Sequence, residues 1–515
     1  MKKIIPQSIK NIYHLFQAIL ANVWFGFPSR KLKVIGVTGT NGKTTTVQMI
    51  AKILEEAGKK IAVASTINFK IGEKEWVNDT KFTTFSSFKL QEFLKKAVAA
   101  GCEYALVEVT SHALDQNRVW GVDFNVAVIT NITREHLDYH ETMEEYARAK
   151  EKLFAMLKLS SDPTARPKRK ADGSRTVAVV NLGMEFAEDF LKYEADQIYG
   201  YAVKIPNSKH QVPNKFQISN NKYQTVVAEN IKIGLNNSQF TVRDVPFELN
   251  LPGEFNIENA LAATCVGLSQ NIPLEKISEA LEKIKGVPGR MERIENDRGL
   301  EIIVDYAVTP DSLDKLYKYI NEIRKSKRSD RVTKEEGGRT ARVIAVFGSC
   351  GERDRGKRPI MGEIVGKFAD FVIVTNEDPY GEDPARIINE VFSGVVRHKI
   401  DGQIPNFQFP RPTRFATRSG QAISNFQTNP KSENPDSKQI QNSKFKIQNS
   451  AKREGVNAWR ILDRREAIKK ALQIAKPGDI VVVTGKGAEE TMAIRDERIP
   501  WNDPKVIREV LRERE

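Results

Sequence analysis

Residues 33–58, KVIGVTGTNGKTTTVQMIAKILEEAG, limit the fold of this chain more than any other segment. The β-branched run at 34–37 predicts a buried parallel strand, and the turn after it leads into an amphipathic helix that Gly58 can end. Backbone N–H groups of such a turn, with the positive end of the helix, form a cradle for phosphate oxygens. We expect the cradle to consist of Gly39, Thr40, Asn41, Gly42, Lys43, Thr44 and Thr45.

Two side chains of this turn carry specific chemistry. The Lys43 ammonium would supply a point charge for terminal phosphates, and the Thr44 hydroxyl suits Mg²⁺. The spacing departs from the strict P-loop pattern, because the first glycine stands at Gly36 instead of position 37. An ordinary glycine-rich turn is the alternative interpretation. Strand, turn, GKT and helix together favour binding of a nucleoside triphosphate.

The length of 515 residues predicts two or three domains, because one hydrophobic core rarely serves so long a chain. Strands alternating with helices over residues 34–180 predict a doubly wound, mostly parallel α/β unit that binds ligands at the carboxyl ends of its strands. Shorter strands over residues 198–250 suggest an antiparallel extension of that sheet. A second, Rossmann-like α/β unit is expected from about residue 290. The predicted domains are a short helical segment (1–32), a central nucleotide-binding domain (33–289) and a C-terminal domain (290–515).

The N-terminal segment lacks charge between residues 11 and 29 and follows three lysines. Polar residues interrupt it, so it is a poor membrane-spanning helix. We expect an amphipathic helix packed on the next domain, and a helix on a membrane surface is the alternative. The apolar residues predicted to pack are Ile12, Leu15, Phe16, Ile19, Leu20 and Val23.

The net charge of +14 raises the question of nucleic-acid binding. Three apparent insertions, 159–175, 324–342 and 397–454, carry 24 basic and nine acidic side chains, which leaves the rest of the chain near neutral. The charge therefore belongs to loops and not to a folded basic face, which disfavours a nucleic-acid partner. Residues 397–454, rich in Asn, Gln, Ser and Lys, are predicted to be disordered.

The three cysteines, Cys102, Cys265 and Cys350, are far apart and form no CxxC pair. This spacing disfavours a disulfide framework or a zinc site, and it fits a reducing cytoplasm.

Four polar clusters follow predicted strands or lie in helices near them. Glu108 ends one strand and is well placed for Mg²⁺. The loop at 131–140 contains His136 and a second histidine, and Lys150 lies in the helix after it. By pattern alone Lys150 would be a surface lysine. An arginine-rich turn at 348–359 could hold carboxylates through paired hydrogen bonds.

These clusters belong to a series of strings that occurs in one order along the chain: VTGTNGKTT, EVTSHALDQNR, TNITREHLDYH, YARAKEKLF, LPGEFNIENALAA, VPGRMERI, VDYAVTPDSL, FGSCGERDRGKRP and TGKGAEE. The series resembles the Mur ligase family, and is most similar to its UDP-N-acetylmuramoyl-tripeptide synthetase (MurE) type. The resemblance covers about residue 33 to the C-terminus, apart from the insertions.

The resemblance implies an ATP-dependent ligase of peptidoglycan precursor synthesis. Such an enzyme adds diaminopimelate or lysine to UDP-MurNAc-L-Ala-D-Glu through an acyl phosphate, mainly by positioning and charge neutralisation. It implies catalytic roles for Lys43, Glu108, His136 and Lys150, with magnesium held by Thr44, Glu108, His136 and Lys150 as a carbamate. ATP would also meet Asn256, Arg290 and Asp305. The muramoyl dipeptide would be held by Thr83, Thr84, Thr110, Gln116 and Arg118, and the amino acid by Arg353, Glu377, Asp378, Tyr380, Gly485 and Glu489.

The chain departs from the family pattern at several points. Only about 33 residues precede the first strand, where family members carry an N-terminal domain, so we expect a truncated one. Val308 and Ala488 replace family histidines, and the diaminopimelate-selecting DNPR string reads Glu377-Asp-Pro-Tyr380. A related ligase acting on another acid, of the folylpolyglutamate type, and a non-catalytic nucleotide-binding descendant are the alternatives.

Overall fold

The structure, a computed structural model, describes residues 6–513 except 79, 81–82, 158–174, 204–221, 235, 333–340 and 398–453. The predicted insertions at 159–175 and 397–454 lie almost wholly outside the described residues. The chain divides into two compact units, Met1–Met291 and Glu292–Glu515, and each is described here by itself. Within the described ranges, no helix has both the length and the apolar character needed to cross a membrane.

A nine-stranded sheet forms the centre of the first unit. Its order is β4 (Lys74–Val77), β3 (Asn68–Ile71), β2 (Ile61–Ala64), β5 (Tyr104–Glu108), β1 (Lys33–Thr38), β6 (Phe124–Ile129), β7 (Val177–Asn181), β8 (Gln197–Ala202) and β9 (Tyr223–Val227). All neighbouring strands are parallel from β2 to β9, and the two pairings at the other edge, β2 with β3 and β3 with β4, are antiparallel. The near-continuous burial of the central strands is typical of a parallel sheet covered on both faces.

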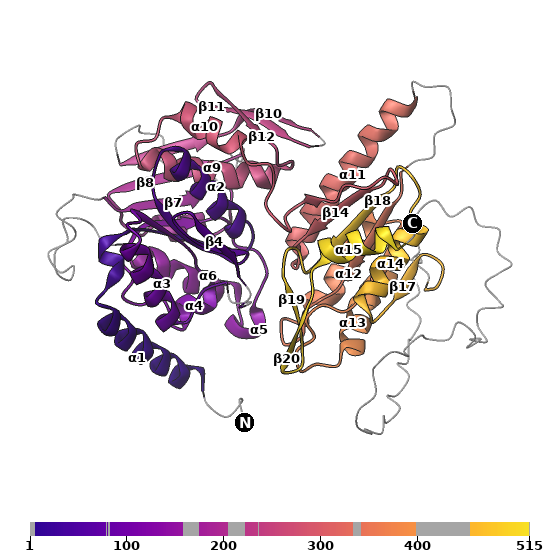
Figure 1. Ribbon diagram of the computed structural model, residues 1–515, viewed down its shortest axis with the longest axis horizontal. Helices are drawn as coiled ribbons and strands as arrows, with labels where there is room; N and C mark the ends of the chain where they lie inside the picture. The colour runs from indigo at the N-terminus through magenta and orange to yellow at the C-terminus, as the bar shows by residue number, and fades with distance from the viewer. Residues whose placement is uncertain are drawn as a thin grey trace. The chain divides into compact units, whose positions relative to one another are not determined.

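Helices cover both faces of this sheet (Figure 1). One face packs against α2 (Lys43–Glu56), α9 (Glu254–Ser269), α10 (Leu274–Glu282) and a three-stranded antiparallel sheet of β10 (Glu229–Ile233), β11 (Ser238–Val242) and β12 (Val245–Leu249). The other face packs against α3 (Ser87–Ala99), α6 (Met143–Ala155) and α7 (Ala187–Leu191). Short helices α4 (Ser111–Asp115) and α5 (Leu137–His140) follow β5 and β6, and the 3₁₀ turn η1 (Pro28–Lys31) precedes β1. Helix α1 (Gln7–Phe25) lies beside α3.

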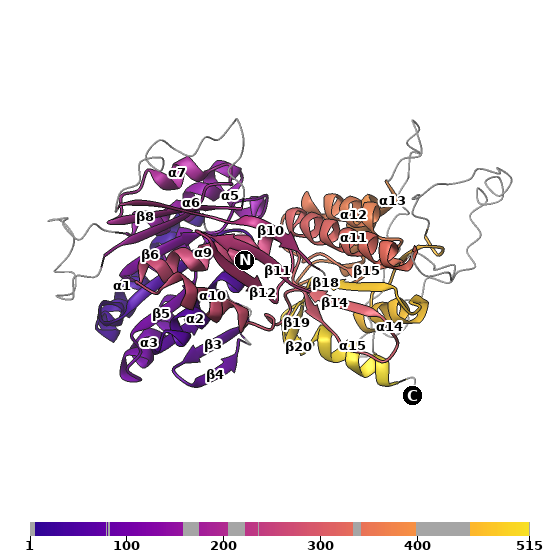
Figure 2. The same cartoon turned by 90° about the horizontal axis from the view of Figure 1, so that it is seen from above.

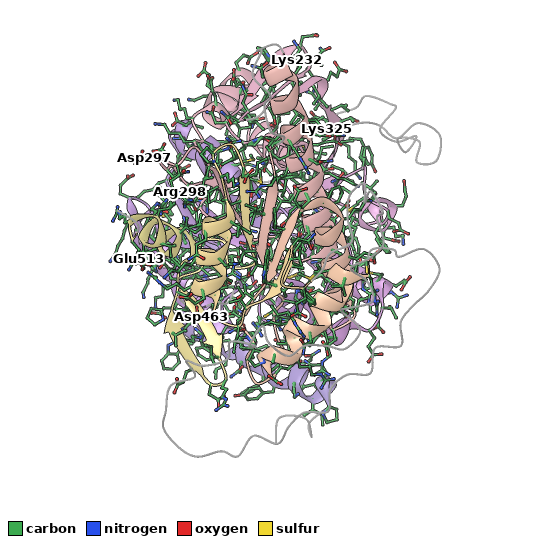
Figure 3. The ribbon with its side chains drawn as sticks, turned by 90° about the vertical axis from the view of Figure 1, so that its right-hand side faces the viewer. Lys232, Asp297, Arg298, Lys325, Asp463 and Glu513 are labelled. Atoms are coloured by element: carbon green, nitrogen blue, oxygen red, sulfur yellow. The ribbon has the colours of Figure 1, made fainter. Side chains whose placement is uncertain are left out.

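The second unit contains a six-stranded sheet, seen from a second direction in Figure 2. Its order is β13 (Glu292–Arg293), β14 (Glu301–Asp305), β18 (Ile480–Thr484), β15 (Val343–Phe347), β16 (Phe371–Val374) and β17 (Ala458–Arg460), and only β13 is antiparallel. Its helices are α11 (Pro310–Val332), α12 (Lys357–Phe368), α13 (Pro384–Val396), α14 (Arg464–Ile474) and α15 (Asp503–Arg512), and a hairpin of β19 (Thr491–Ile494) and β20 (Glu497–Pro500) precedes α15. Asp463, labelled in Figure 3, caps α14 by accepting a hydrogen bond from the Glu466 N–H at 3.0 Å.

The structure corrects three sequence-based expectations. Strands β8 and β9 continue the parallel sheet, and only β10 to β12 are antiparallel, in a sheet of their own. Residues 324–332, predicted as part of a basic insertion, belong to α11. The N-terminal helix does not bury its large apolar residues: Ile12, Phe16 and Val23 are 68, 63 and 62% exposed. Small and polar side chains of α1 face the unit instead. The amide groups of Asn11 and Asn22 reach hydrogen-bond partners there.

Candidate active site

The turn between β1 and α2 adopts a conformation that only glycine allows at two positions. Gly39 has φ of 145°, and a Cβ there would lie 1.8 Å from the Thr130 hydroxyl oxygen. Gly42 has φ of 83°, and a Cβ there would lie 2.2 Å from Asn259 Oδ1. A side chain at either position would therefore meet both backbone strain and a steric clash. The turn leads directly into α2, so the helix N-terminus lies at the position where the sequence predicts an anion cradle.

The loop after β6 fixes the conformation of this turn. The Asn41 N–H donates to Asn131 Oδ1 at 2.9 Å, and the Thr40 N–H donates to the Asn131 carbonyl at 2.9 Å. Thr130 Oγ1 donates to the Asn41 carbonyl at 2.6 Å, and the Thr133 N–H donates to Thr40 Oγ1 at 3.0 Å. Sequence reasoning assigned no role to Thr130 or Thr133. Their position directly after a parallel strand beside β1 was the available signal.

Two lysines point at the carbonyl groups of the turn. Lys43 Nζ donates to the Gly39 and Thr40 carbonyls at 3.1 and 2.9 Å. Lys150 Nζ, on α6, donates to the same Gly39 carbonyl at 2.9 Å and lies 4.4 Å from the centre of the Tyr146 ring. Lys150 is 1% exposed, so the surface position suggested by its sequence pattern is wrong. Burial lowers the pKa of Lys43 and holds the pKa of Lys150 well below its usual range, and in each case the other nearby cations add to the shift.

A buried carboxylate and a hydroxyl group form the second part of the site. Glu108 is 1% exposed at the end of β5, where it pairs in register with Val37 of β1. Thr44 Oγ1 donates to the two Glu108 carboxylate oxygens at 3.2 and 3.1 Å, and the Thr66 N–H donates to Oε2 at 2.9 Å. Arg290 Nη2 donates to Thr44 Oγ1 at 3.3 Å. These hydrogen bonds connect the start of α2, through Thr44, to Glu108 at the end of β5.

This pair fits a magnesium ion by the chemistry of its donors. Mg²⁺ prefers oxygen ligands and is commonly bound through one or two carboxylates together with substrate phosphates. In the part of the chain that the structure describes, no three His, Cys, Asp or Glu side chains gather in a way that could hold a metal by themselves. A cation bound at Thr44 and Glu108 would therefore need further ligands from phosphate groups, water or a modified side chain.

His136 belongs to an aromatic cluster beside the turn. Its ring lies 4.6 Å from that of His112 and 6.2 Å from that of Tyr146, the ring that also contacts Lys150. Its backbone has φ of 57°, a conformation that non-glycine residues adopt infrequently. His140, in the same cluster, is buried, and this burial lowers its pKa to about 4. The structure thus gathers three of the six histidines beside the glycine turn.

The residues expected to hold the dipeptide extend from Glu108 along the same edge of the sheet. Thr84 Oγ1 donates to the Glu108 carbonyl at 2.9 Å and accepts from the Thr110 N–H at 3.0 Å, and Thr83 Oγ1 accepts from Thr66 Oγ1 at 3.1 Å. Thr110 also caps α4.

Gln116 and Arg118 form the far end of this row. The Arg118 guanidinium donates to Gln116 Oε1, and Gln116 Nε2 donates to the Tyr139 hydroxyl at 3.3 Å. Tyr139 in turn donates to Asp115 at 2.8 Å. Asp115 and Tyr139 were not predicted, although both lie in strings that the sequence singled out.

Asn256 lies in the first turn of α9 and reaches the glycine turn through a neighbour. Asn259 Nδ2 donates to Asn256 Oδ1 at 3.4 Å, and Asn259 Oδ1 is the atom that excludes a side chain at Gly42. Asn259 was not predicted, and its position one helical turn from Asn256 was the available signal.

The residues expected to bind the amino acid gather at the carboxyl ends of the strands of the second unit. Lys486, 0% exposed, donates to Asp378 Oδ2 at 2.8 Å and to Glu489, and the Tyr306 hydroxyl donates to Glu489 at 3.1 Å. The Lys486 ammonium therefore already compensates the charge of two predicted carboxylates. Lys486 lies in the string TGKGAEE, but the sequence analysis assigned it no role.

Glu377 and Tyr380 complete this group. A Cβ at Gly485 would lie 2.3 Å from Glu377 Oε2, and burial raises the pKa of Glu377 to about 7, against the opposing charge of Arg464. The Arg353 guanidinium lies 5.9 Å from the centre of the Tyr380 ring. Asp305, expected to meet ATP, ends β14 in the same unit, where its carbonyl accepts from the Gly485 N–H at 3.2 Å.

The fold and the glycine turn with its two lysines and buried carboxylate define a nucleotide-binding α/β protein of the P-loop class. Residues 37–267 match the model of the Mur ligase middle domain, and residues 289–404 match that of the Mur ligase, glutamate ligase domain.

Individual relatives agree with these matches. The chain is 35% identical to a UDP-N-acetylmuramyl-tripeptide synthetase of Roseiflexus sp. (strain RS-1), over 96% of this chain and 82% of the relative. It is 33% identical to a UDP-N-acetylmuramoyl-L-alanyl-D-glutamate--2,6-diaminopimelate ligase of Syntrophomonas wolfei, over 96% of this chain and 81% of the relative. The chain belongs to the Mur ligase family.

Solved structures show the same fold. A UDP-N-acetylmuramoyl-L-alanyl-D-glutamate--2,6-diaminopimelate ligase aligns with a TM-score of 0.50 and 28% identity, over 94% of this chain and 79% of that one. A folylpolyglutamate synthase of Mycobacterium tuberculosis aligns with a TM-score of 0.56 but 15% identity, over 92% of this chain and 96% of that one. Because the identity is only 15%, the similarity to the folylpolyglutamate synthase supports the fold alone.

Proposed function

We propose that this chain is an ATP-dependent amide ligase that adds an amino acid with a distal ammonium group, diaminopimelate or lysine, to UDP-N-acetylmuramoyl-L-alanyl-D-glutamate in cytoplasmic peptidoglycan precursor synthesis. The observation that carries the proposal is the convergence of Lys43, Thr44, Glu108 and Lys150 on one glycine turn. The names of its relatives support the substrates. The free cysteines Cys102, Cys265 and Cys350 support the cytoplasm.

In this proposal the first unit holds the nucleotide. The N–H groups at the start of α2 and the Lys43 ammonium bind the phosphates, and Asn256 contacts the adenine, with Arg290 as a further contact of this unit. Asp305, a residue of the second unit, is proposed as an additional ATP contact. Thr44 and Glu108 hold a magnesium ion, and His136 helps to hold a second. When bound, magnesium neutralises charge that develops on the transferring phosphoryl group. Lys43 contributes to the same neutralisation, because its ammonium points into the turn.

Lys150 acts in the proposal as a carbamate. A buried lysine with a lowered pKa keeps a neutral amine, which is the form that reacts with CO₂. The product carries a negative charge and oxygen donors, and it would give the site the additional magnesium ligand that the described carboxylates do not supply.

The two substrates bind to the remaining groups. Thr83, Thr84, Thr110, Gln116 and Arg118 position the acceptor, whose carboxylate takes the γ-phosphoryl group of ATP and then loses it as phosphate when the amine attacks. Arg353 and Tyr380 face the amino acid together with Glu377, Asp378, Gly485 and Glu489. Because Lys486 already pairs with Asp378 and Glu489, Glu377 is the carboxyl group that would receive the substrate ammonium.

The test is release of phosphate from ATP by the purified chain. We expect release only when the acceptor and the amino acid are both present, and Lys43→Ala should lower the rate on the order of a hundredfold or more, since its charge acts in the transition state. Lys52→Ala is the matched control, because Lys52 lies on the same helix and forms a partly exposed ion pair with Glu56. Equal rates in Lys43→Ala and Lys52→Ala would contradict the assignment of the site.

A panel of amino acids in the same assay decides the choice of substrate. Tyr380 offers one neutral hydroxyl donor where an arginine would offer two charged ones, so the site has lost a partner for the distal carboxylate of diaminopimelate. Preference for diaminopimelate would assign that carboxylate to Arg353. Preference for lysine would mean that recognition of the distal ammonium is sufficient. Turnover with neither would contradict the proposed substrate class.

A further inference from the structure

Helix α1 is attached to the first unit by its small and polar face. Ala18, Ala21 and Asn22 are 0% exposed. Asn22 Nδ2 donates to the Trp120 carbonyl at 2.8 Å, and Asn11 Nδ2 donates to Asp115 Oδ2 at 3.1 Å. Near the start of the helix, Gln7 Nε2 donates to the Tyr139 hydroxyl at 2.8 Å. Hydrogen bonds and close backbone approach, and not burial of large apolar side chains, therefore hold this helix in place.

The opposite face of α1 presents large apolar residues to solvent. In an α-helix, residues three and four apart lie on one face, and the exposed residues follow that spacing along the whole helix. Figure 1 shows α1 at the outer side of the first unit, with α3 between it and the sheet. The exposed apolar face consists of Ile9, Ile12, Tyr13, Phe16, Ile19, Leu20, Val23 and Trp24, of which Trp24 is 74% exposed.

The charged side chains of α1 itself and of the segment that follows it are all basic. The first 54 residues of the chain contain no Asp or Glu, and six Lys or Arg lie within the first 33. Arg30 and Lys31 are exposed just after the helix, and Lys95 of α3 lies 5.8 Å from the Phe25 ring at the end of α1. The exposed acid of α3, Glu92, pairs with Lys96 at 2.7 Å. A positive rim thus borders the apolar face.

From this arrangement we propose that the exposed apolar face of α1 binds the surface of an anionic membrane. An apolar stripe with Trp, Tyr and Phe, bordered by Lys and Arg, is the pattern of a helix that lies in the lipid interface. Apolar side chains enter the acyl boundary, and the cations meet anionic headgroups. A second copy of the chain fits this face less well, because a two-fold contact would bring the two positive rims together.

The experiment is flotation of the full-length chain with lipid vesicles. We expect the protein to float with vesicles of phosphatidylglycerol and phosphatidylethanolamine, to bind less to pure phosphatidylcholine, and to be released as salt rises, because salt screens the headgroup attraction. The fluorescence of Trp24 should be quenched by brominated lipid, and Trp24→Phe should remove that part of the quenching. Absence of binding to anionic vesicles at low salt would overturn the proposal.

Matched variants distinguish vesicle binding by the exposed apolar face of α1 from non-specific hydrophobic binding by any exposed apolar residue. The triple variant Ile12→Gln, Phe16→Gln and Leu20→Gln should weaken vesicle binding by about tenfold or more, since each apolar side chain adds to the partition free energy. The control is Val77→Gln, Ile233→Gln and Val456→Gln, which changes three exposed apolar residues elsewhere and should bind like the wild type. Both variants should keep wild-type ligase activity, because none of these residues lies in the site.

Two further outcomes would contradict membrane binding by α1. Equal loss of vesicle binding in the two triple variants would overturn the role of α1. A concentration-dependent dimer in sedimentation, dissociated by the α1 variant and accompanied by no vesicle binding, would show that a second copy covers the face.

Discussion

At the scale of single residues, Lys150 is the side chain whose environment is least like that of an ordinary lysine. Its amine is enclosed between the Gly39 carbonyl and the Tyr146 ring, and no described carboxylate contacts it directly. A buried ammonium without a carboxylate partner is costly, so the neutral amine or its anionic carbamate is the stable form.

We therefore predict that Lys150→Ala lowers the rate of ligation on the order of a hundredfold or more, because a magnesium ligand is lost from a site where charge develops. Short carboxylates such as formate should restore part of the activity. The modification itself can be followed by NMR with isotopically labelled bicarbonate. Arg148→Ala, which changes an exposed cation on the same helix, is the control. It should leave the ligation rate and the carbamate NMR signal unchanged. A free amine in active, substrate-saturated protein would contradict the prediction.

Glu377 provides a prediction about pH. Burial raises its pKa from 4.5 to about 7, so the folded chain holds a proton there that the unfolded chain has lost. Between those two values the folded state binds more protons, and stability must fall as pH rises through this window. The loss should be on the order of 3 kcal/mol for a shift of this size. Urea unfolding at several pH values measures it.

Glu377→Gln should remove that fall, because an amide does not titrate. Glu497→Gln, a change at an exposed glutamate of β20, is the control and should keep the wild-type dependence on pH. An unchanged pH profile in Glu377→Gln would show that another group causes it.

At the scale of elements, the spacing of apolar residues predicted the position of most helices and strands. It did not predict features that depend on contacts with distant segments of the chain. The strand before the glycine turn, the helix after it and the start of α6 at Thr142 are confirmed, because each rests on local rules: Thr142 accepts from the Glu145 N–H at 3.2 Å. The second bond of the predicted capping box is absent, because the Thr142 N–H donates to the His140 carbonyl at 2.7 Å. The sheet to which a short strand belongs depends on distant segments, so β8 and β9 were placed wrongly.

The same limit applies to α1 and to the site residues. Periodicity correctly indicated an amphipathic helix but not which face is turned inward, because Asn11 and Asn22 find partners that lie about a hundred residues away in the chain. Likewise, Lys150 was named through the family resemblance, since its own sequence pattern is that of a surface residue. The Mur ligase resemblance is confirmed, and the roles of individual site residues stay predictions.

An element-scale prediction concerns the attachment of α1. Asn22→Ala removes the two hydrogen bonds to the Ala18 and Trp120 carbonyls, and it should lower the free energy of unfolding by about 1 to 3 kcal/mol. Val23→Ala, the neighbouring change on the exposed face, should have an effect within about 0.5 kcal/mol. Urea denaturation of the two variants compares the faces directly. Greater destabilisation by Val23→Ala would mean that the outer face is the buried one.

At the scale of the whole molecule, the net charge of the chain and its ligase chemistry are separable. The candidate site residues of each unit lie at the ends of its strands and in its helices, whereas much of the positive charge belongs to segments with few apolar residues. Residues 401–453, outside the described residues, carry nine basic and three acidic side chains, so their removal would lower the net charge from +14 to +8. Its composition, low in apolar residues, leads us to expect no contribution to a hydrophobic core.

We therefore predict that a chain lacking residues 401–453 elutes from heparin at lower salt, because non-specific attraction to polyanions follows net charge. Its melting temperature and its ligase kcat/KM should match those of the full chain. Replacing the same residues by a neutral Gly/Ser linker of equal length is the control for the distance between α13 and β17, and it should behave like the deletion. If both variants lose activity, the segment contributes to folding or catalysis, and the separation of charge from chemistry is wrong. If only the deletion does so, the chain needs the length of this connection and not its charge.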